Sequence, residues 1–221
     1  MNNNIALIFG ATGQLGREIT NELSKLNTTL ILVGKNQEKL KQINEDIKNN
    51  LKKNITLVST DLSHTRSIEK LGNEIFKRFG KLDVLINCTS FFPKLSPINH
   101  ITPKDFNKIV NINIIASWNI IRSFDPLLKL SKQGRAYFMI CKKYKKKPYF
   151  SSYNLANSAI ETLISTWQEE NNKSNLKVEA YDPGIFASPL RSQTFPGENK
   201  NKIMTANKAA KIFIKNYKNN Y

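Results

Sequence analysis

The feature that most constrains the fold is a glycine-rich turn near the N-terminus, which joins an apolar run to an amphipathic segment. The apolar run covers residues 5–9. Glycines follow it at every third position, at Gly10, Gly13 and Gly16. Apolar side chains then recur at helical spacing over residues 15–23. A strand, a glycine turn and a helix form the start of a βαβ unit that binds dinucleotides, although ordinary strand-to-helix turns share this spacing.

Each part of this turn has a physical role in holding a phosphate. Glycine lets the backbone turn sharply and lets a pyrophosphate approach it. The first N–H groups of the helix have no partners within the helix, and the helix dipole makes this end positive. Because the turn follows the apolar run directly, its position favours a nucleotide-binding site.

Apolar runs and helical patterns alternate along the rest of the chain, which predicts an α/β fold with a doubly wound parallel sheet and helices on both faces. The expected strands cover residues 5–9, 29–33, 55–59, 82–87, 136–141 and 176–181. The expected helices cover residues 17–23, 36–49, 65–79, 103–130 with a bend near 111–113, 152–170 and 205–217. We expect a loop at residues 91–101, no seventh strand, and a single domain spanning residues 1–221.

Composition narrows the class of protein. No apolar stretch approaches the roughly 18 residues that a membrane span needs. The first residues carry no basic region or cleavage site of a signal peptide. Two cysteines, Cys88 and Cys141, fit a reducing cytoplasm, and the isolated His64 and His100 form no metal site. We therefore expect a cytoplasmic protein with neither a membrane nor a metal partner.

The formal net charge of +17 is high enough to attract a nucleic acid or an anionic membrane surface. The lysines are spread over almost every segment, and only residues 142–147 form a cluster. This distribution favours a generally basic surface over a nucleic-acid site, and such a surface also favours a phosphate-bearing cofactor. Nucleic-acid binding by the 142–147 cluster is the weaker alternative.

Further motifs follow the glycine turn in a definite order. They are Asp61-Leu62 after the third expected strand, Leu85-Ile86-Asn87-Cys88-Thr89-Ser90, Val110-Asn111-Ile112-Asn113, Tyr153, and Asp182-Pro183-Gly184-Ile185-Phe186-Ala187-Ser188. In this order they resemble the motifs of the short-chain dehydrogenase/reductase family over essentially the whole chain. Within the family, the segments 122–128 and 191–198 resemble a bacterial subgroup without an assigned substrate.

The resemblance implies a Rossmann-like sheet with strand order 3-2-1-4-5-6 and a nicotinamide cofactor across the carboxyl ends of its strands. It implies hydride transfer between that cofactor and an alcohol or carbonyl compound. The catalytic positions carried over are Tyr153 as proton donor, Asn113 as organiser of a water relay, and Cys141 beside the carbonyl. The cofactor-binding positions carried over are Gly10, Thr12, Gly13, Gln14, Leu15, Gly16, Lys35, Asp61, Leu62, Asn87, Cys88, Tyr153, Asn157, Pro183, Gly184 and Ser188.

The sequence departs from the family pattern at a position that the family uses in catalysis. Asn157 stands where the family has a lysine, four residues after the catalytic tyrosine. Asparagine can bond a ribose hydroxyl but supplies no charge. An unassisted tyrosine has a pKa of about 10, so Tyr153 would be a poor base at neutral pH but remains a usable acid. Phe9 and Gln14 also depart from the usual glycine-turn pattern.

The serine of the family is missing as well. Strand register places Cys141 at its position, whereas counting back thirteen residues from Tyr153 places Ile140 there. We prefer Cys141, because it is the small residue at the expected strand end. A thiol is a weaker donor than a hydroxyl, and Cys141 is equally well explained as a small buried side chain.

The end of the second expected strand bears on the choice of cofactor. An acidic residue there binds the ribose 2′-hydroxyl and repels a 2′-phosphate. The chain has no carboxylate at residues 33–36, and Lys35 could pair with a phosphate. NADP(H) is therefore expected in preference to NAD(H), unless Lys35 is simply one more surface lysine.

Two functions remain open from the sequence. One is an NADP(H)-dependent reductase of a small carbonyl compound, and the other is a non-catalytic NAD(P)-binding protein that has lost the lysine and the serine. We expect residues 142–147 to form an entry loop beside the cofactor. A homodimer or homotetramer is expected from apolar side chains on two helices, Ile114, Ile115, Trp118, Ile121, Leu155, Ile160, Leu163 and Trp167.

Overall fold

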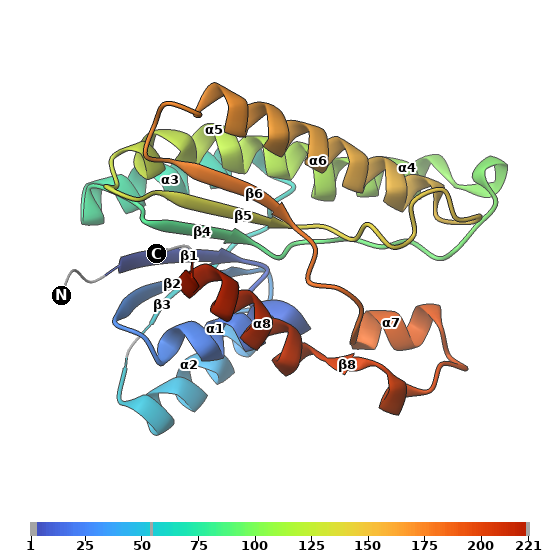
Figure 1. The fold of residues 1–221 in the computed structure, drawn as a ribbon, viewed down its shortest axis with the longest axis horizontal. Coiled ribbons are helices and arrows are strands. Elements are labelled where there is room, and N and C mark those ends of the chain that lie inside the picture. The colour runs from blue at the N-terminus through green and yellow to red at the C-terminus, as the bar shows by residue number, and fades with distance from the viewer. Residues whose placement is uncertain (1–3, 54, 220–221) are drawn as a thin grey trace.

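A computed structural model, which describes residues 4–53 and 55–219, has one parallel sheet at its centre (Figure 1). The strands follow the order β3-β2-β1-β4-β5-β6. They are β1 (Asn4–Phe9), β2 (Thr28–Gly34), β3 (Thr56–Ser59), β4 (Val84–Asn87), β5 (Arg135–Met139) and β6 (Lys177–Tyr181). Every pairing in this sheet is parallel. The doubly wound sheet and its strand order are therefore confirmed.

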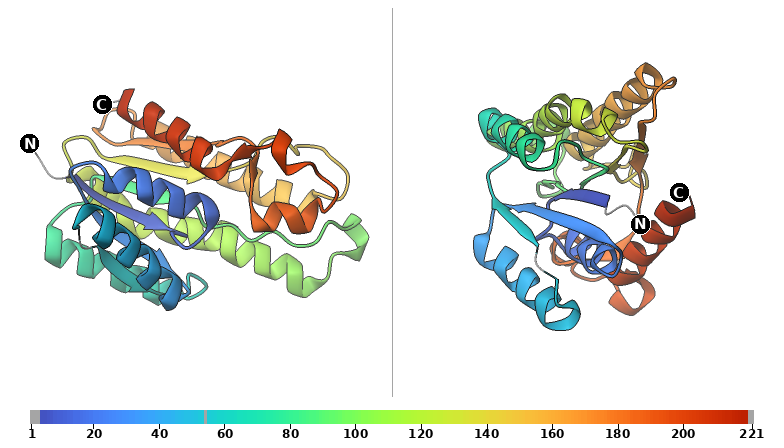
Figure 2. Two further views of the ribbon diagram at one scale, coloured as in Figure 1. Left: turned by 90° about the horizontal axis from the view of Figure 1, so that it is seen from below. Right: turned by 90° about the vertical axis from the view of Figure 1, so that its left-hand side faces the viewer.

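Helices cover both faces of the sheet (Figures 1 and 2). One face carries α1 (Gln14–Ser24), α2 (Gln37–Leu51) and α8 (Ala206–Asn219). The other carries α3 (Thr65–Phe79), α4 (Pro103–Ile109), α5 (Ala116–Lys129) and α6 (Ser151–Glu170). Among the helices that the structure describes, none combines the length and apolar character needed to cross a bilayer.

The central strands are apolar along their length because helices bury them on both sides. In β1, Leu7 and Phe9 pack into the core beneath α3, α5 and α6. Ala6 and Ile8, which point to the opposite face, pack against α1, α2 and α8. All four side chains are fully buried, so the continuous apolar run that opened the sequence is a central strand.

The expected bend in the long helical stretch is a π-helical turn. It covers Val110–Ile115 (η2) and separates α4 from α5. Asn113 lies within this turn and is 3% exposed. A wider turn of this kind rotates the side chains that follow it, and such turns are frequent at functional sites.

The carboxyl side of the sheet differs from the expectation in two ways. The segment between β6 and α8, where no further strand was expected, contains a pair of short parallel strands and a helix, β7 (Phe186–Ala187), α7 (Pro189–Thr194) and β8 (Met204–Thr205). Strand β5 ends at Met139, two residues earlier than predicted. The N–H of Ile140 still bonds to the carbonyl of Tyr181, but the N–H of Cys141 bonds to a side chain of α6. Figure 1 shows α7 and β8 beyond the carboxyl ends of the strands.

Candidate active site

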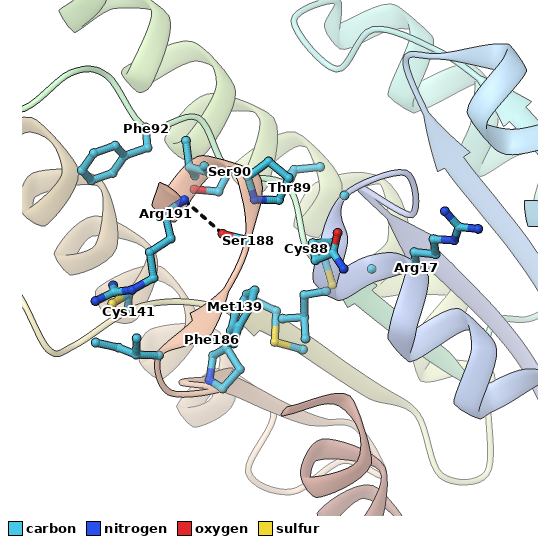
Figure 3. A pocket seen from close by; sticks show the side chains of 18 of the residues that line it. Arg17, Cys88, Thr89, Ser90, Phe92, Met139, Cys141, Phe186, Ser188 and Arg191 are labelled. Atoms are coloured by element: carbon cyan, nitrogen blue, oxygen red, sulfur yellow. Dashed lines mark hydrogen bonds between the residues drawn. The ribbon is translucent and has the colours of Figure 1, made fainter. Parts of the chain in front are cut away.

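A cleft of about 610 Å³ lies at the carboxyl ends of the strands (Figure 3). Its walls come from the segments that follow β1, β4, β5 and β6, together with α7. In Figure 3 Arg17 and Cys88 lie at one end, and Phe92, Cys141 and Arg191 lie at the other. Open α/β sheets bind their ligands at this edge, so the position and the volume both suit a nucleotide with a substrate beside it.

The glycine turn forms one end of the cleft. Gly10 has a φ of +70°, and a Cβ atom there would lie 2.8 Å from the carbonyl carbon of Cys88. Only glycine fits this close approach. The N-terminus of α1 opens into the cleft beside it, where the N-cap Gly13 has no capping side chain and the first turn has no acidic residue. These uncapped N–H groups fit the pyrophosphate of a dinucleotide.

Lys35 does not line this cleft. Its Nζ lies 2.7 Å from Oδ2 of Asp61, and this contact together with Ser63 holds the pKa of the Asp61 carboxyl well below its usual range. The cations at the glycine end are instead Arg17 and Lys39. Arg17 pairs with Asp46 at 2.7 Å, whereas no carboxylate of the described residues forms an ion pair with Lys39. The sequence did not single out Lys39, because it lies in the first turn of a helix and belongs to no motif.

The predicted site residues divide into two groups. Those that line the cleft are Thr12, Gly13, Gln14, Leu15, Gly16, Cys88, Cys141, Tyr153, Pro183, Gly184 and Ser188. Those that lie outside its lining are Gly10, Lys35, Asp61, Leu62, Asn87, Asn113 and Asn157. Most of the glycine turn and the 182–188 segment thus meet at one cavity, as the motif order implied.

Two of the residues outside the lining form hydrogen bonds to the backbone of a segment that lines the cleft. The side-chain oxygen of Asn87 accepts a hydrogen bond from the N–H of Thr89 at 3.0 Å. The side chain of Asn113 bonds both the N–H and the carbonyl of Phe91, at 2.7 and 2.9 Å. Each asparagine is 3% exposed. Together they fix the segment after β4, which supplies Ser90 and Phe92 to the cleft.

Tyr153 enters the cleft from the first turn of α6. Burial, together with the nearby Cys141, raises the pKa of its hydroxyl to about 12. The groups that oppose this rise are the neutral Asn157 amide and the Ser90 hydroxyl. The tyrosine therefore stays protonated at neutral pH and can act as an acid rather than a base. Ser90 lies in the 85–90 motif, but no feature of the sequence assigned it a role.

The structure favours Cys141 over Ile140 beside the tyrosine. Both residues line the cleft, but Ile140 is an apolar core side chain without a hydrogen-bond donor, whereas Cys141 carries a thiol close enough to Tyr153 to help raise the pKa of its hydroxyl. Burial raises the pKa of the Cys141 thiol, and the N–H groups of Lys143 and Tyr144 oppose this. The thiol is therefore protonated at neutral pH. The prediction that Cys141 lies at the strand end was wrong, however, since β5 ends at Met139.

Asn157 connects the end of β5 to α6. Its side-chain oxygen accepts a hydrogen bond from the N–H of Cys141 at 2.7 Å, and its NH₂ group donates to the carbonyl of Tyr153 at 2.8 Å. It lines a small neighbouring pocket of about 50 Å³ rather than the large cleft. In this structure Asn157 positions the segment that carries Tyr153, a role that sequence spacing could not show.

We therefore expect Asn157→Ala to lower the free energy of unfolding by about 1–3 kcal/mol, because the N–H of Cys141 loses its partner. Urea denaturation measures this change. Ser158→Ala is the matched control, since Ser158 is exposed and lines the same small pocket. The control should stay within about 0.5 kcal/mol of the parent. Equal losses in the two variants would show that Asn157 is not a structural link.

The sequence did not predict the residues that line the end of the cleft farthest from the glycine turn. Arg191 of α7 binds both carboxylate oxygens of Glu198 and donates to the hydroxyl of Tyr144. Of residues 142–147 only Tyr144 lines the cleft, and the nearby Lys142 pairs with Glu161 at 2.9 Å. The expected entry loop thus presents a tyrosine to the cavity, while its lysines lie outside the lining.

Comparison with known proteins agrees with this geometry. The model of the short chain dehydrogenase family matches residues 4–199. An uncharacterized oxidoreductase of Escherichia coli (strain K12), YciK, is 23% identical over 93% of this chain and 82% of its own length. An NADPH-dependent pterin aldehyde reductase of Arabidopsis thaliana is 30% identical over 58% of this chain and 52% of its own length.

A solved structure shares the fold closely. A short chain dehydrogenase of Escherichia coli CFT073, complexed with NADPH, superposes with a TM-score of 0.91 at 22% identity, over 97% of this chain and 90% of its own. The sheet order, the glycine turn at its carboxyl edge and the family match point the same way. This chain belongs to the short-chain dehydrogenase/reductase family of NAD(P)-dependent oxidoreductases.

Proposed function

We propose that the protein is an NADP(H)-dependent reductase of a carbonyl compound and that Tyr153 is its proton donor. The observation that carries this proposal is the position of Tyr153, whose side chain lines the cleft beside Ser90 and Cys141. When bound, the nicotinamide cofactor supplies a hydride. We take residues 1–221 as one domain that works in a reducing cytoplasm, in keeping with the free thiols of Cys88 and Cys141.

The side chains of the chain itself perform the other half of the reaction. Tyr153 gives its proton to the carbonyl oxygen as negative charge develops there. Ser90 and Cys141 donate hydrogen bonds toward the same oxygen, with Ser90 the stronger donor of the two. The tyrosinate that results regains a proton from solvent. No positive charge at position 157 is needed in this direction, because the tyrosine starts in its protonated form.

The alternative is a non-catalytic NAD(P)-binding protein, and one observation favours it. The side chain at position 157 is used for structural bonds and does not reach the large cleft. Titration with NADPH and NADH, followed by a panel of aldehydes and ketones, separates the two functions. Turnover of a carbonyl compound supports the reductase. Tight cofactor binding without turnover across the panel supports the binding protein.

The preference for NADP(H) rests on the basic glycine end of the cleft. Lys39 lines it without an ion-pair partner among the described residues, whereas Lys35 is paired with Asp61. A 2′-phosphate placed there gains charge-assisted hydrogen bonds. Solved relatives of similar fold have been found with NADP and with NADPH. Lys39 therefore takes the role in cofactor selection that was expected of Lys35.

We expect Lys39→Gln to raise the Kd for NADPH by about tenfold and to leave the Kd for NADH unchanged. Fluorescence titration with each cofactor measures both constants. Lys35→Gln, the same change at the neighbouring lysine, is the control and should have the smaller effect on NADPH. If Lys35→Gln has the larger effect, Lys35 binds the phosphate as the sequence suggested.

A homo-oligomer formed through α4–α6 is part of the same proposal. Large apolar side chains remain about 40–48% exposed on these elements, namely Phe106, Ile115, Trp118 and Leu155. Exposed apolar patches of this kind mark interfaces. Two residues expected on that surface, Ile160 and Trp167, are instead buried in the core of the same chain.

Leu155→Glu should convert the oligomer to a monomer, because it places a charge on the exposed apolar surface. Light scattering at micromolar concentration measures the mass. Ile212→Glu is the control, since Ile212 is similarly exposed on α8, on the opposite face of the sheet. A monomeric parent protein would contradict the proposal.

A further inference from the structure

Aromatic side chains form a continuous wall in the part of the cleft beyond the glycine turn. They come from four segments of the chain and all line the cavity, at Phe92, Tyr144, Phe150, Tyr153 and Phe195. The wall begins at the proton donor, because the rings of Phe92 and Tyr153 meet edge to face with centroids 4.6 Å apart. Phe150 follows, with its centroid 5.9 Å from that of Phe92.

The rest of the wall is a stack of nearly parallel rings. Tyr144 and Phe150 are stacked at 4.3 Å with an interplanar angle of 5°. Phe195 lies at 22° to both of them, with centroid distances of 5.8 and 6.2 Å. Aromatic side chains that line a cavity favour a planar aromatic partner over a saturated one of equal size, because the ring quadrupoles add to simple apolar burial.

The charges at this end of the cleft are balanced. The guanidinium of Arg191 packs over the ring of Phe195 at 4.6 Å and uses its Nε and Nη2 on the two oxygens of Glu198. Its Nη1 donates to Tyr144. A carboxylate in the substrate would have to compete with Glu198 for this cation, so the arrangement favours an uncharged ligand.

We infer that the substrate is an uncharged aldehyde or ketone that carries an aromatic ring near its carbonyl group. The inference rests on the proposed reductase function and specifies the substrate of the same site. The ring packs against the aromatic wall, and the carbonyl faces Tyr153. A hydride from NADPH forms the new C–H bond, the C=O π pair moves to oxygen, and Tyr153 protonates that oxygen. NADPH is oxidised to NADP⁺, and the carbonyl compound is reduced to an alcohol.

The first test compares phenylacetaldehyde with cyclohexylacetaldehyde. A methylene group separates ring and carbonyl in both, so the intrinsic reactivity of the two aldehydes is similar. We expect kcat/KM to be about tenfold higher for the aromatic aldehyde. Equal values, or a preference for the saturated ring, would overturn the inference.

Phe195→Leu tests whether the aromatic wall causes this preference, because leucine keeps the apolar character and removes the ring. We expect the preference for phenylacetaldehyde to fall by about fivefold, with little change for cyclohexylacetaldehyde. Phe76→Leu is the matched control, since Phe76 is 51% exposed on α3 and does not line the cleft. NADPH affinity, which should be unchanged in both variants, verifies that the fold is intact. An unaltered preference in Phe195→Leu would contradict the role of the wall.

A second pair of substrates, 4-formylbenzamide and 4-formylbenzoate, differs mainly in charge and tests the preference for an uncharged ligand. We expect the amide to be reduced about tenfold more efficiently. Glu198→Gln should narrow this difference, because it leaves the charge of Arg191 unbalanced. Preferential reduction of the benzoate by the parent protein would show that Arg191 binds substrate carboxylates.

Failure of this inference can be distinguished from failure of the proposed function. If no aldehyde is reduced, the reductase proposal fails, and binding alone then tests the pocket. Calorimetric titration of the NADPH complex with 2-phenylethanol and 2-cyclohexylethanol provides that readout. Stronger binding of 2-phenylethanol supports an aromatic ligand site, and equal binding overturns it.

Discussion

Tyr153→Phe should lower kcat/KM for NADPH-dependent carbonyl reduction by about 10²–10⁴-fold, the range typical of a lost general acid. The substitution removes only the hydroxyl, and the edge-to-face contact with Phe92 remains possible. NADPH affinity and the free energy of unfolding should therefore change little. Steady-state kinetics, fluorescence titration of NADPH and urea denaturation measure the three quantities on the same preparation.

Tyr144→Phe is the matched control for this result. Tyr144 also lines the cleft, and its hydroxyl accepts a hydrogen bond from the Arg191 guanidinium. We expect a loss of tenfold or less, about the size expected of one hydrogen bond at the substrate end. If Tyr144→Phe abolishes reduction and Tyr153→Phe does not, the proton donor is Tyr144 and the assignment from the motif is wrong.

The two directions of the reaction should differ strongly in their dependence on pH. With the pKa of Tyr153 raised to about 12 by burial, only about one molecule in 10⁵ carries tyrosinate at pH 7. Alcohol oxidation needs that tyrosinate as a base, so its rate should rise about tenfold per pH unit between pH 7 and 10. Reduction uses the protonated form, which predominates throughout this range, and should be nearly independent of pH.

Asn157→Lys tests the cause of this asymmetry. A cation one helical turn from Tyr153 favours the tyrosinate, so the oxidation profile should move to lower pH. The same change removes the acceptor of the Cys141 N–H, so the variant should also be less stable. An oxidation rate in the parent protein that already levels off near neutral pH would show that another cation lowers the pKa of Tyr153.

The strands themselves and the glycine end of the cleft could be predicted because their signals are local, whereas the order of the strands in the sheet was implied by the resemblance to the family. The run of residues 5–9 is apolar throughout, as a strand buried on both faces must be, and Gly10 follows it at once. The bend within residues 110–115 was also predictable. The helix at Pro189–Thr194 had a readable signal that was overlooked, since Ser188 caps it and proline is its first residue.

The rest of the site depends on contacts between segments that are distant in the sequence. Lys35 and Lys39 look alike in the sequence, and only the packing of α2 shows that Lys39 faces the cleft. The bond between Asn157 and the backbone of Cys141 spans 16 positions. The aromatic wall joins residues of four segments, and no pattern along the chain connects them.

The most direct test of the central claim follows deuterium from NADPH, labelled at C4 of the nicotinamide, into an alcohol product. Parent protein and Tyr153→Phe are incubated with the carbonyl panel, and mass spectrometry measures the label. We expect alcohol with one deuterium from the parent protein and at least about 100-fold less from Tyr153→Phe. A parent protein that binds NADPH but transfers no deuterium to any carbonyl compound would contradict the account and identify a binding protein.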